Sequence, residues 1–412
     1  MDRDTRKRDI LIIGGGPSGL STALHLQRIA PHLAPRILIL EKEHYPRPKL
    51  CAGGLVLDAE ILLARLGLDV REVPHADADG IRFDFEGKGL NIRVPRKHAL
   101  RVIRRHEFDN WLAQKAKDRG IKIEEGISVR KIIRRERDVT VEADDREFQA
   151  QVVVGADGSN GVTRRCVFPN APVQTARVLE VITPSQPPPN SRSLGEVPAG
   201  RGRSAYFDFF PVPNNIAGYV WDFPTQINGE PARCWGIYDT NLLAGEKRPQ
   251  LKEPLAQEMS RLGFNLGDYE IEGHPIRMFS PRNEMSVPGV LLVGDAAGAD
   301  PLLGEGISMA LGYGNIAAQA IRDAFQKDDF SFDDYRKRIL LSPLGRTLLA
   351  RRLVMKVIYP LKWKWFQIFL WRISKPIVIS IAWLFVLNWG RRMRFPQPGP
   401  LPEGGEIRSP TL

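Results

Sequence analysis

Short apolar runs recur along the chain and suggest its architecture. Four of them consist only of isoleucine, leucine and valine: residues 10–13, 37–40, 152–154 and 290–293. Uniform runs of this length are typical of parallel strands that are buried on both faces. Residues 18–30 and 308–325 carry apolar residues at helical spacing instead. Strands followed by helices in this way predict a Rossmann-type unit.

The middle of the chain has a different pattern. Residues 204–210 and 217–223 form short apolar-alternating runs separated by proline-rich loops, which is typical of an antiparallel sheet. We expect this sheet to cover residues 170–282, with further strands from residues 76–97. The predicted fold class is therefore α/β: a Rossmann-type domain interleaved with an antiparallel-sheet domain, followed by C-terminal helices.

The first glycine cluster, GGGPSG at residues 14–19, lies between a predicted strand and a predicted helix. Gly14 permits a tight turn, and Gly16 lets a pyrophosphate approach the backbone. Gly19 lets the helix pack closely on the strand. The helix N-terminus that follows would face the phosphates, with Ser18 among the contacts.

The second strand supports a dinucleotide site because it ends in an acidic residue, Glu41, which is followed by Lys42. The Glu41 carboxylate can accept hydrogen bonds from both hydroxyls of an adenosine ribose. It would repel a 2′-phosphate, so we expect the nucleotide not to be NADP. Lys42 is a further candidate contact.

Two later clusters, GADGSNG at 155–161 and GDAAGADPLLGEGI at 294–307, also follow apolar runs. Strand ends direct side chains into a crevice, although such glycine–aspartate pairs are also ordinary turn dipeptides. Backbone amides after Gly304 would face the pyrimidine edge of a flavin. The expected cofactor contacts in these clusters are Asp157, Gly158, Asp295, Gly304, Gly306 and Ile307. The three clusters occur in the order that a chain needs to wrap an FAD.

Further segments resemble one family. Arg105 stands three residues before Phe108–Asp109, residues 48–54 read PKLCAGG, and residues 219–224 read YVWDFP. With these motifs, roughly residues 8–335 resemble the geranylgeranyl reductase family, in the hydroxybenzoate-hydroxylase-like branch of FAD proteins. Two positions depart from its pattern: Ala52 replaces a glycine, and Tyr238 stands where a second glycine would follow Gly236.

The resemblance implies an FAD enzyme that saturates isolated carbon–carbon double bonds of a polyprenyl lipid. It implies flavin contacts from Arg105, Cys51, Ala52 and Gly53, and it makes Cys51, Tyr219 and Trp221 the catalytic candidates. A prenyl pocket would be lined by Tyr219, Trp221, Phe223 and Pro224. On the residues alone, the aromatics also fit an ordinary sheet core, and Cys51 also fits a small buried apolar residue.

Two other functions stay open. A flavin monooxygenase or halogenase would share the cofactor site and differ in what the reduced flavin meets. A non-catalytic flavoprotein could instead stabilise a membrane complex. The electron donor, NADPH or a ferredoxin, cannot be chosen because the chain has only one dinucleotide fingerprint.

Composition fits a globular protein of 412 residues, with 43% apolar and 26% charged residues. Three widely spaced cysteines predict neither a disulfide framework nor a zinc site, and we expect no metal. The charged start, MDRDTRKRD, has no apolar segment typical of a signal peptide. These features predict a cytoplasmic protein.

Residues 336–394 carry fourteen Lys or Arg and no Asp or Glu, against a net charge of +11 for the whole chain. They also hold five of the eight tryptophans: Trp363, Trp365, Trp371, Trp383 and Trp389. The apolar content is too high for a nucleic-acid surface, so we expect peripheral binding to a membrane. The apolar run 377–389 is shorter than the roughly 20 residues of a spanning helix. Alternatively, these helices cover the substrate pocket.

The expected division of the chain follows from these assignments. The FAD-binding domain comprises residues 1–75, 98–169 and 283–335, and the substrate domain comprises residues 76–97 and 170–282. Residues 336–395 form a basic helical region at the membrane. Residues 396–412 form a disordered tail, because they are rich in proline and glycine.

Overall fold

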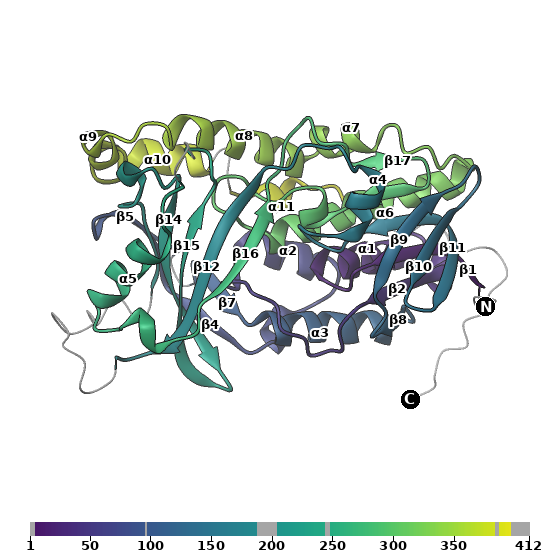
Figure 1. Cartoon of the computed structure of the whole chain (residues 1–412), viewed down its shortest axis with the longest axis horizontal. Coiled ribbons are helices and arrows are strands. Elements are labelled where there is room, and N and C mark those ends of the chain that lie inside the picture. Colours follow the sequence, from purple (N-terminus) through teal and green to yellow (C-terminus); the bar gives the residue numbers. More distant parts are fainter. Residues whose placement is uncertain (1–4, 95–96, 188–203, 244–247, 384–386, 397–412) are drawn as a thin grey trace.

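The computed structural model describes residues 5–94, 97–187, 204–243, 248–383 and 387–396; the predicted tail lies outside them except for Pro396. These residues form three sheets with helices around them (Figure 1). The mixed α/β fold confirms the predicted class. The domain boundaries stay a prediction.

The largest sheet has a parallel centre built from the four predicted apolar runs. In spatial order its parallel strands are β18 (Val290–Leu292), β11 (Arg146–Gly155), β1 (Thr5–Ile13), β2 (Ile37–Glu41) and β8 (Lys122–Glu125). Three strands extend it in antiparallel pairs: β17 (Ser286–Val287), β10 (Val139–Ala143) and β9 (Val129–Arg134).

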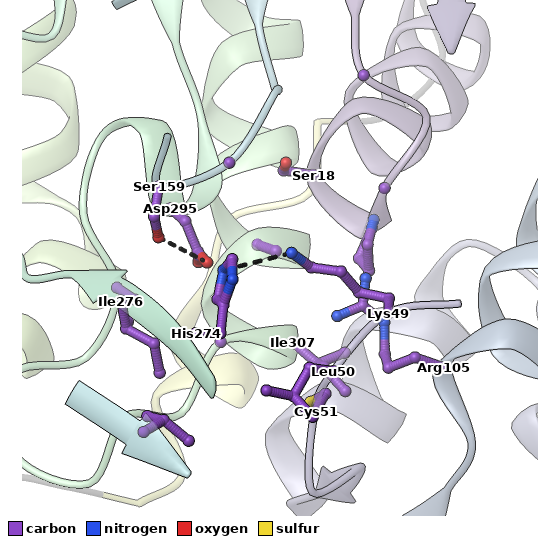
Figure 2. A pocket seen from close by; sticks show the side chains of 18 of the residues that line it. Ser18, Lys49, Leu50, Cys51, Arg105, Ser159, His274, Ile276, Asp295 and Ile307 are labelled. Carbon is purple, nitrogen blue, oxygen red and sulfur yellow. Dashed lines mark hydrogen bonds between the residues drawn. The ribbon is translucent and has the colours of Figure 1, made fainter. Parts of the chain in front are cut away.

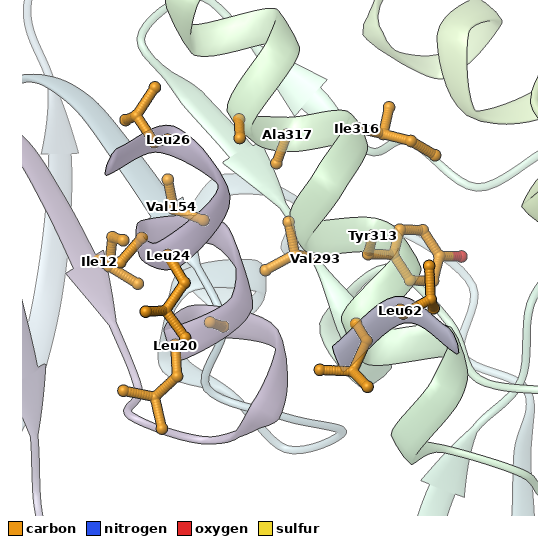
Figure 3. Packing of buried hydrophobic residues seen from close by; sticks show 14 of the residues in the cluster. Ile12, Leu20, Leu24, Leu26, Leu62, Val154, Val293, Tyr313, Ile316 and Ala317 are labelled. Atoms are coloured by element: carbon orange, nitrogen blue, oxygen red, sulfur yellow. The ribbon is translucent and has the colours of Figure 1, made fainter. Parts of the chain in front are cut away.

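Alternation along β1 gives this sheet two covered faces. Ile10 and Ile12 belong to the core beneath the helices, whereas Leu11 and Ile13 pack with residues of β9 and β10. Figure 3 shows how the helices meet strand residues such as Val154. The helices around this sheet are α1 (Pro17–Ile29), α2 (Leu57–Arg65), α3 (Arg105–Asp118), α4 (Val162–Val167) and α6 (Ile307–Lys327).

The second sheet has seven strands, which come from residues 80–93 and 175–277. Their order is β16 (Glu272–Arg277), β12 (Thr175–Pro184), β15 (Glu230–Asp239), β14 (Gly218–Ile227), β13 (Ser204–Asp208), β5 (Gly80–Phe85) and β6 (Lys88–Arg93). All neighbours are antiparallel except β13 and β5. Helix α5 (Lys252–Ser260) packs on this sheet. Elsewhere along the chain, short 3-10 turns occupy Pro31–Arg36, Val70–Glu72, Val212–Asn214, Leu266–Asp268 and Gly294–Ala296.

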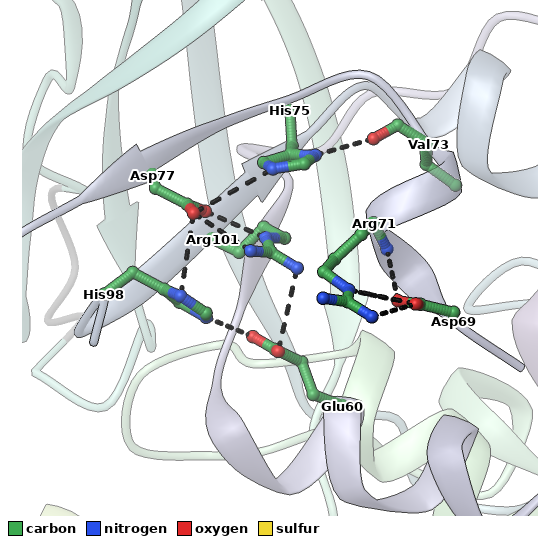
Figure 4. A network of polar contacts seen from close by, with 8 residues as sticks. All are labelled: Glu60, Asp69, Arg71, Val73, His75, Asp77, His98 and Arg101. Atoms are coloured by element: carbon green, nitrogen blue, oxygen red, sulfur yellow. Dashed lines mark hydrogen bonds and ion pairs between the residues drawn. The ribbon is translucent and has the colours of Figure 1, made fainter. Parts of the chain in front are cut away.

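A small third sheet connects the two larger ones. It consists of β3 (Gly54–Leu55), β7 (Leu100–Ile103) and β4 (His75–Ala78). Arg101 donates to Asp77 through Nε at 2.8 Å and Nη2 at 2.9 Å, and His98 contacts both Asp77 and Glu60 (Figure 4). This network fastens α2 to the small sheet. Strand β7 also pairs with β3, which begins three residues after Cys51.

The C-terminal region is helical and runs alongside both large sheets (Figure 1). It comprises α7 (Tyr335–Leu341), α8 (Pro343–Ile358), α9 (Lys364–Ile368), a π-helical turn (Phe369–Ile373), α10 (Lys375–Ile381) and α11 (Trp389–Arg392). Among the described residues, no helix is both long enough and apolar enough to cross a bilayer.

Two features of this region bear on its predicted role. Within the apolar run 377–389, α10 ends at Ile381, and Asn388 has a left-handed φ of 62° before α11 begins. Trp371 and Trp389 are buried within the protein rather than available to a membrane. The Trp371 ring stacks on Phe209 with 4.1 Å between centroids. The π-helical turn therefore packs beside the seven-stranded sheet, whereas Trp389 lies against Gly312 of α6.

Candidate active site

One cavity of about 680 Å³ extends from the β1–α1 turn to an aromatic wall on the seven-stranded sheet. Figure 2 shows the Lys49–Cys51 segment facing His274 and Asp295 across it. Most predicted site residues line it: Gly14, Gly16, Ser18, Glu41, Lys42, Cys51, Ala52, Gly53, Arg105, Asp157, Gly158, Tyr219, Trp221, Phe223, Asp295, Gly304, Gly306 and Ile307. Gly19 and Pro224 do not line it.

The β1–α1 turn has the geometry of a phosphate site. Gly14 has a φ of +102°, and a Cβ there would lie 2.5 Å from the Ala156 carbonyl oxygen. At Gly19, a Cβ would lie 2.1 Å from the Gly14 carbonyl oxygen, so its role is to close the turn beneath the site. Helix α1 begins at Pro17 and presents its N-terminus to the cavity.

Two arginines flank this turn. Arg105 donates to Asp109 through Nε at 2.7 Å and Nη2 at 2.8 Å, and Arg47 Nη2 lies 3.1 Å from the same carboxylate. Burial lowers the pKa of Arg105, but Asp109 outweighs burial and raises that pKa above its ordinary value. Both guanidiniums approach Gly16, and Arg47 Nε has no hydrogen-bond partner among the described residues. A pyrophosphate fits this anion site.

Glu41 is buried at the end of β2, as its predicted role requires. Its Oε2 accepts a hydrogen bond from the Gly15 N–H at 2.8 Å and lies 3.5 Å from Arg47 Nε. The carboxylate therefore holds the turn while it lines the cavity. Lys42 lines the same end but is exposed.

The two aspartates of the later clusters have internal partners. Asp157 Oδ2 accepts from the Thr163 N–H at 2.8 Å and from its hydroxyl at 3.0 Å, which fastens the start of α4. Asp295 Oδ2 accepts from the Ser159 hydroxyl at 3.4 Å. Helix α6 begins at Ile307, after the glycine-rich loop. Backbone amides of that loop thus lie beside the cavity as expected.

Cys51 lies between the cofactor end and the aromatic wall, and its Sγ accepts from the Gly53 N–H at 3.4 Å. Burial raises the pKa of the thiol, and the positive charge of Arg105 offsets this only in part. The group is therefore a protonated thiol at neutral pH. A neutral thiol can donate a proton.

The aromatic wall comes from one face of β14, where Tyr219, Trp221 and Phe223 all line the cavity. The Tyr219 hydroxyl donates to the Leu303 carbonyl oxygen, so it positions the loop before Gly304. A Cβ at Gly236 would overlap the Trp221 ring, whereas Tyr238 lies 5.5 Å from Tyr219 between ring centroids. Tyr238 thus adds to the wall where the family pattern has glycine.

Sequence reasoning gave no role to two polar cavity residues, Glu180 and His274. Lys49 Nζ lies 3.4 Å from His274 Nε2, and Glu180 lies in the middle of β12. The signal for Glu180 was a single acid between Leu179 and Val181 in an apolar strand. His274 and Lys49 meet from distant segments, and no local pattern predicts their contact.

Comparisons with known proteins agree with this site. A family model described as "FAD binding domain" matches residues 7–230, more than half of the chain. The digeranylgeranylglycerophospholipid reductase of Methanosarcina acetivorans is 26% identical over 355 residues, 80% of each chain. Protein FixC of Escherichia coli O157:H7 is 24% identical over 373 residues, 84% of each chain.

Solved structures share the fold. A geranylgeranyl bacteriochlorophyll reductase-like protein from Thermoplasma acidophilum has a TM-score of 0.74 at 19% identity, covering 94% of this chain and 98% of that one. Halogenase PltM in complex with phloroglucinol and FAD has a TM-score of 0.64 at 15% identity, covering 87% and 78%. The chain therefore belongs to the FAD binding domain family and is an FAD-dependent oxidoreductase with geranylgeranyl reductase-like relatives.

Proposed function

We propose that this oxidoreductase saturates isolated double bonds of a polyprenyl lipid. The observation that carries the proposal is one cavity joining a flavin site to an aromatic wall, with the Cys51 thiol between them. Bound FAD supplies the hydride when it is reduced. The chain contributes an apolar wall for the prenyl chain and a protonated thiol as the proton donor.

The test uses the FAD-loaded protein, reduced without oxygen and mixed with geranylgeranyl lipids. We expect the flavin to reoxidise and the lipid to gain two hydrogens for each reduced bond, measured by mass spectrometry. A fully saturated lipid is the matched control and should leave the flavin reduced. Comparison of NADPH with reduced ferredoxin as reductant would identify the donor.

The alternative reaction is oxygen activation, since the fold also occurs in a flavin-dependent halogenase. Oxygen activation would be favoured if the reduced protein does not reduce prenyl lipids but forms peroxide rapidly in air. Cys51→Ser separates the two. It should retain FAD but slow lipid reduction at least tenfold, whereas oxygen consumption should be unchanged.

The C-terminal helices are the proposed membrane surface. Trp363, Trp365 and Trp383 are 58%, 65% and 62% exposed, beside exposed aliphatic residues such as Ile373 and Ile377. The segment carries only positive charge among its ionisable side chains. Exposed tryptophans with lysines and arginines fit the headgroup region of an anionic bilayer.

Flotation with vesicles containing phosphatidylserine tests this surface. A much smaller fraction of the double variant Trp363→Ser with Trp365→Ser than of the wild type should float with the vesicles. Val173→Ser removes a similarly exposed apolar residue from the substrate domain and serves as the control. Equal flotation of both variants would contradict the proposed surface.

A further inference from the structure

Glu180 is an acid in the cavity that the proposed reaction has not used. It occupies the middle of β12, is 3% exposed, and lines the same cavity as Cys51. Its Oε2 has no hydrogen-bond partner among the described residues. Buried carboxylate oxygens are normally paired, so an unpaired one beside an active-site cavity is a sign of function.

The groups around Glu180 come from four elements. Glu272 of β16 lies opposite Glu180 in the strand register, and the Cys51 backbone N–H, the Cys234 thiol of β15 and Arg104 at the start of α3 each lower the pKa of the Glu180 carboxyl group. Burial raises the pKa of Glu180 to about 7, and Arg104 and the two cysteine donors offset this only in part. The acid can therefore hold or release a proton near neutral pH.

Cys51 and Glu180 also interact directly through charge. The negative carboxylate adds to burial in raising the pKa of the Cys51 thiol, while Arg105 opposes it. A carboxylate that makes the neighbouring thiol more basic also favours return of a proton to that sulfur. Cys234 also acts on the pKa of this carboxyl group, but it is fully buried and does not line the cavity.

We propose that Glu180 restores the Cys51 proton after each turnover. This inference rests on the proposed function. The Cys51 S–H bond breaks as its proton goes to the substrate carbon opposite the hydride, which leaves a thiolate. The Glu180 carboxyl group then gives its proton to that sulfur and becomes a carboxylate. Solvent protonates Glu180 again, so each cycle consumes one hydride and one proton.

The test compares Glu180→Gln with the wild type in full-length, FAD-loaded protein. The first readout is Cys51 alkylation by iodoacetamide between pH 6 and pH 9, measured on the Cys51 peptide by mass spectrometry. Loss of the negative charge should make Cys51 react about threefold or more faster at pH 8. Cys166 in the same digest is the internal reference and should not change.

The second readout separates proton supply from a structural role. A single turnover uses the proton already on Cys51, so Glu180→Gln should match the wild type in that assay. Steady-state reduction should slow at least tenfold and lose its pH dependence near 7. Glu270→Gln removes an exposed acid that precedes β16 and should behave as the wild type in both assays.

Several outcomes would overturn the inference. Unchanged Cys51 alkylation in Glu180→Gln would remove the coupling, and an equal loss in single-turnover and steady-state rates would indicate a structural role. If Glu180→Gln does not retain FAD, Glu180→Asp is tested instead. This variant keeps a carboxyl group, so its steady-state rate should stay within about threefold of the wild-type rate. Failure of the wild type to reduce any prenyl lipid would refute the proposed function, whereas the alkylation assay would still report on Glu180.

Discussion

Arg351 of α8 connects the C-terminal helices to the loop that precedes α6. Its Nη1 donates to Asp300 Oδ2 and to Glu305 Oε2, both at 2.7 Å, and the side chain is 1% exposed. Burial lowers the pKa of Arg351, but Asp300 and Glu305 outweigh burial and raise it. We therefore predict that Arg351→Met destabilises the protein and weakens FAD binding.

The magnitude follows from what the substitution leaves behind. Removal of one partner from a buried ion pair costs about 3–5 kcal/mol, because the remaining charge stays buried without its counter-charge. Asp300 keeps hydrogen bonds from the N–H groups of Leu302 at 2.8 Å and Leu303 at 3.2 Å. We therefore expect Arg351→Met to lower the free energy of unfolding by about 3 kcal/mol, the lower end of that range.

Urea unfolding of the FAD-free protein measures the stability loss, and flavin fluorescence measures affinity. Glu305 lies between the cavity residues Gly304 and Gly306, so a displaced Glu305 should raise the FAD Kd about tenfold. Arg352→Met is the matched control, because Arg352 is partly exposed and donates to the Phe279 carbonyl oxygen at 3.0 Å. If Arg351→Met lowers the free energy of unfolding no more than Arg352→Met does, the reasoning is refuted.

Other substitutions test single contacts. Glu41→Ala leaves the Gly15 N–H without its acceptor and should raise the FAD Kd tenfold or more in fluorescence titration, whereas the exposed Glu43→Ala should not. Gly19→Ala places a methyl group against the turn and should cost about 1–3 kcal/mol in urea unfolding; an unchanged midpoint would contradict that contact. The folded pKa of Glu180, about 7, exceeds its ordinary value of 4.5, so stability should fall by on the order of 3 kcal/mol as pH rises through that window. Glu180→Gln should flatten this slope.

The sequence was sufficient to predict those parts of the site that each lie within one continuous segment. The β1–α1 turn, the acid at the end of β2 and the start of α6 each lie within one continuous segment, so spacing alone predicted them. The same holds for the wall, because alternation along a strand places Tyr219 and Trp221 on one face.

Contacts between distant segments were not predictable in this way. The hydrogen bond from the Ser159 hydroxyl to Asp295 joins two glycine clusters that lie far apart in the sequence. The contact between Arg47 and Asp109 joins a loop to a helix far along the chain. Trp389 carried the aromatic signal of a membrane segment, yet it packs against Gly312 of α6. Composition cannot distinguish such a core tryptophan from an interfacial one.

The C-terminal helices also hold the loop that precedes α6 at the cavity, in addition to forming the proposed membrane surface. The Tyr359 hydroxyl donates to the Leu302 carbonyl oxygen at 2.9 Å, next to the contact between Arg351 and Asp300. Deletion after Asp334 would remove both contacts together with buried Trp389, so loss of membrane binding in such a protein would not identify the surface. Substitution of exposed side chains such as Trp363 leaves these contacts in place. A change in flotation can then be assigned to the surface alone.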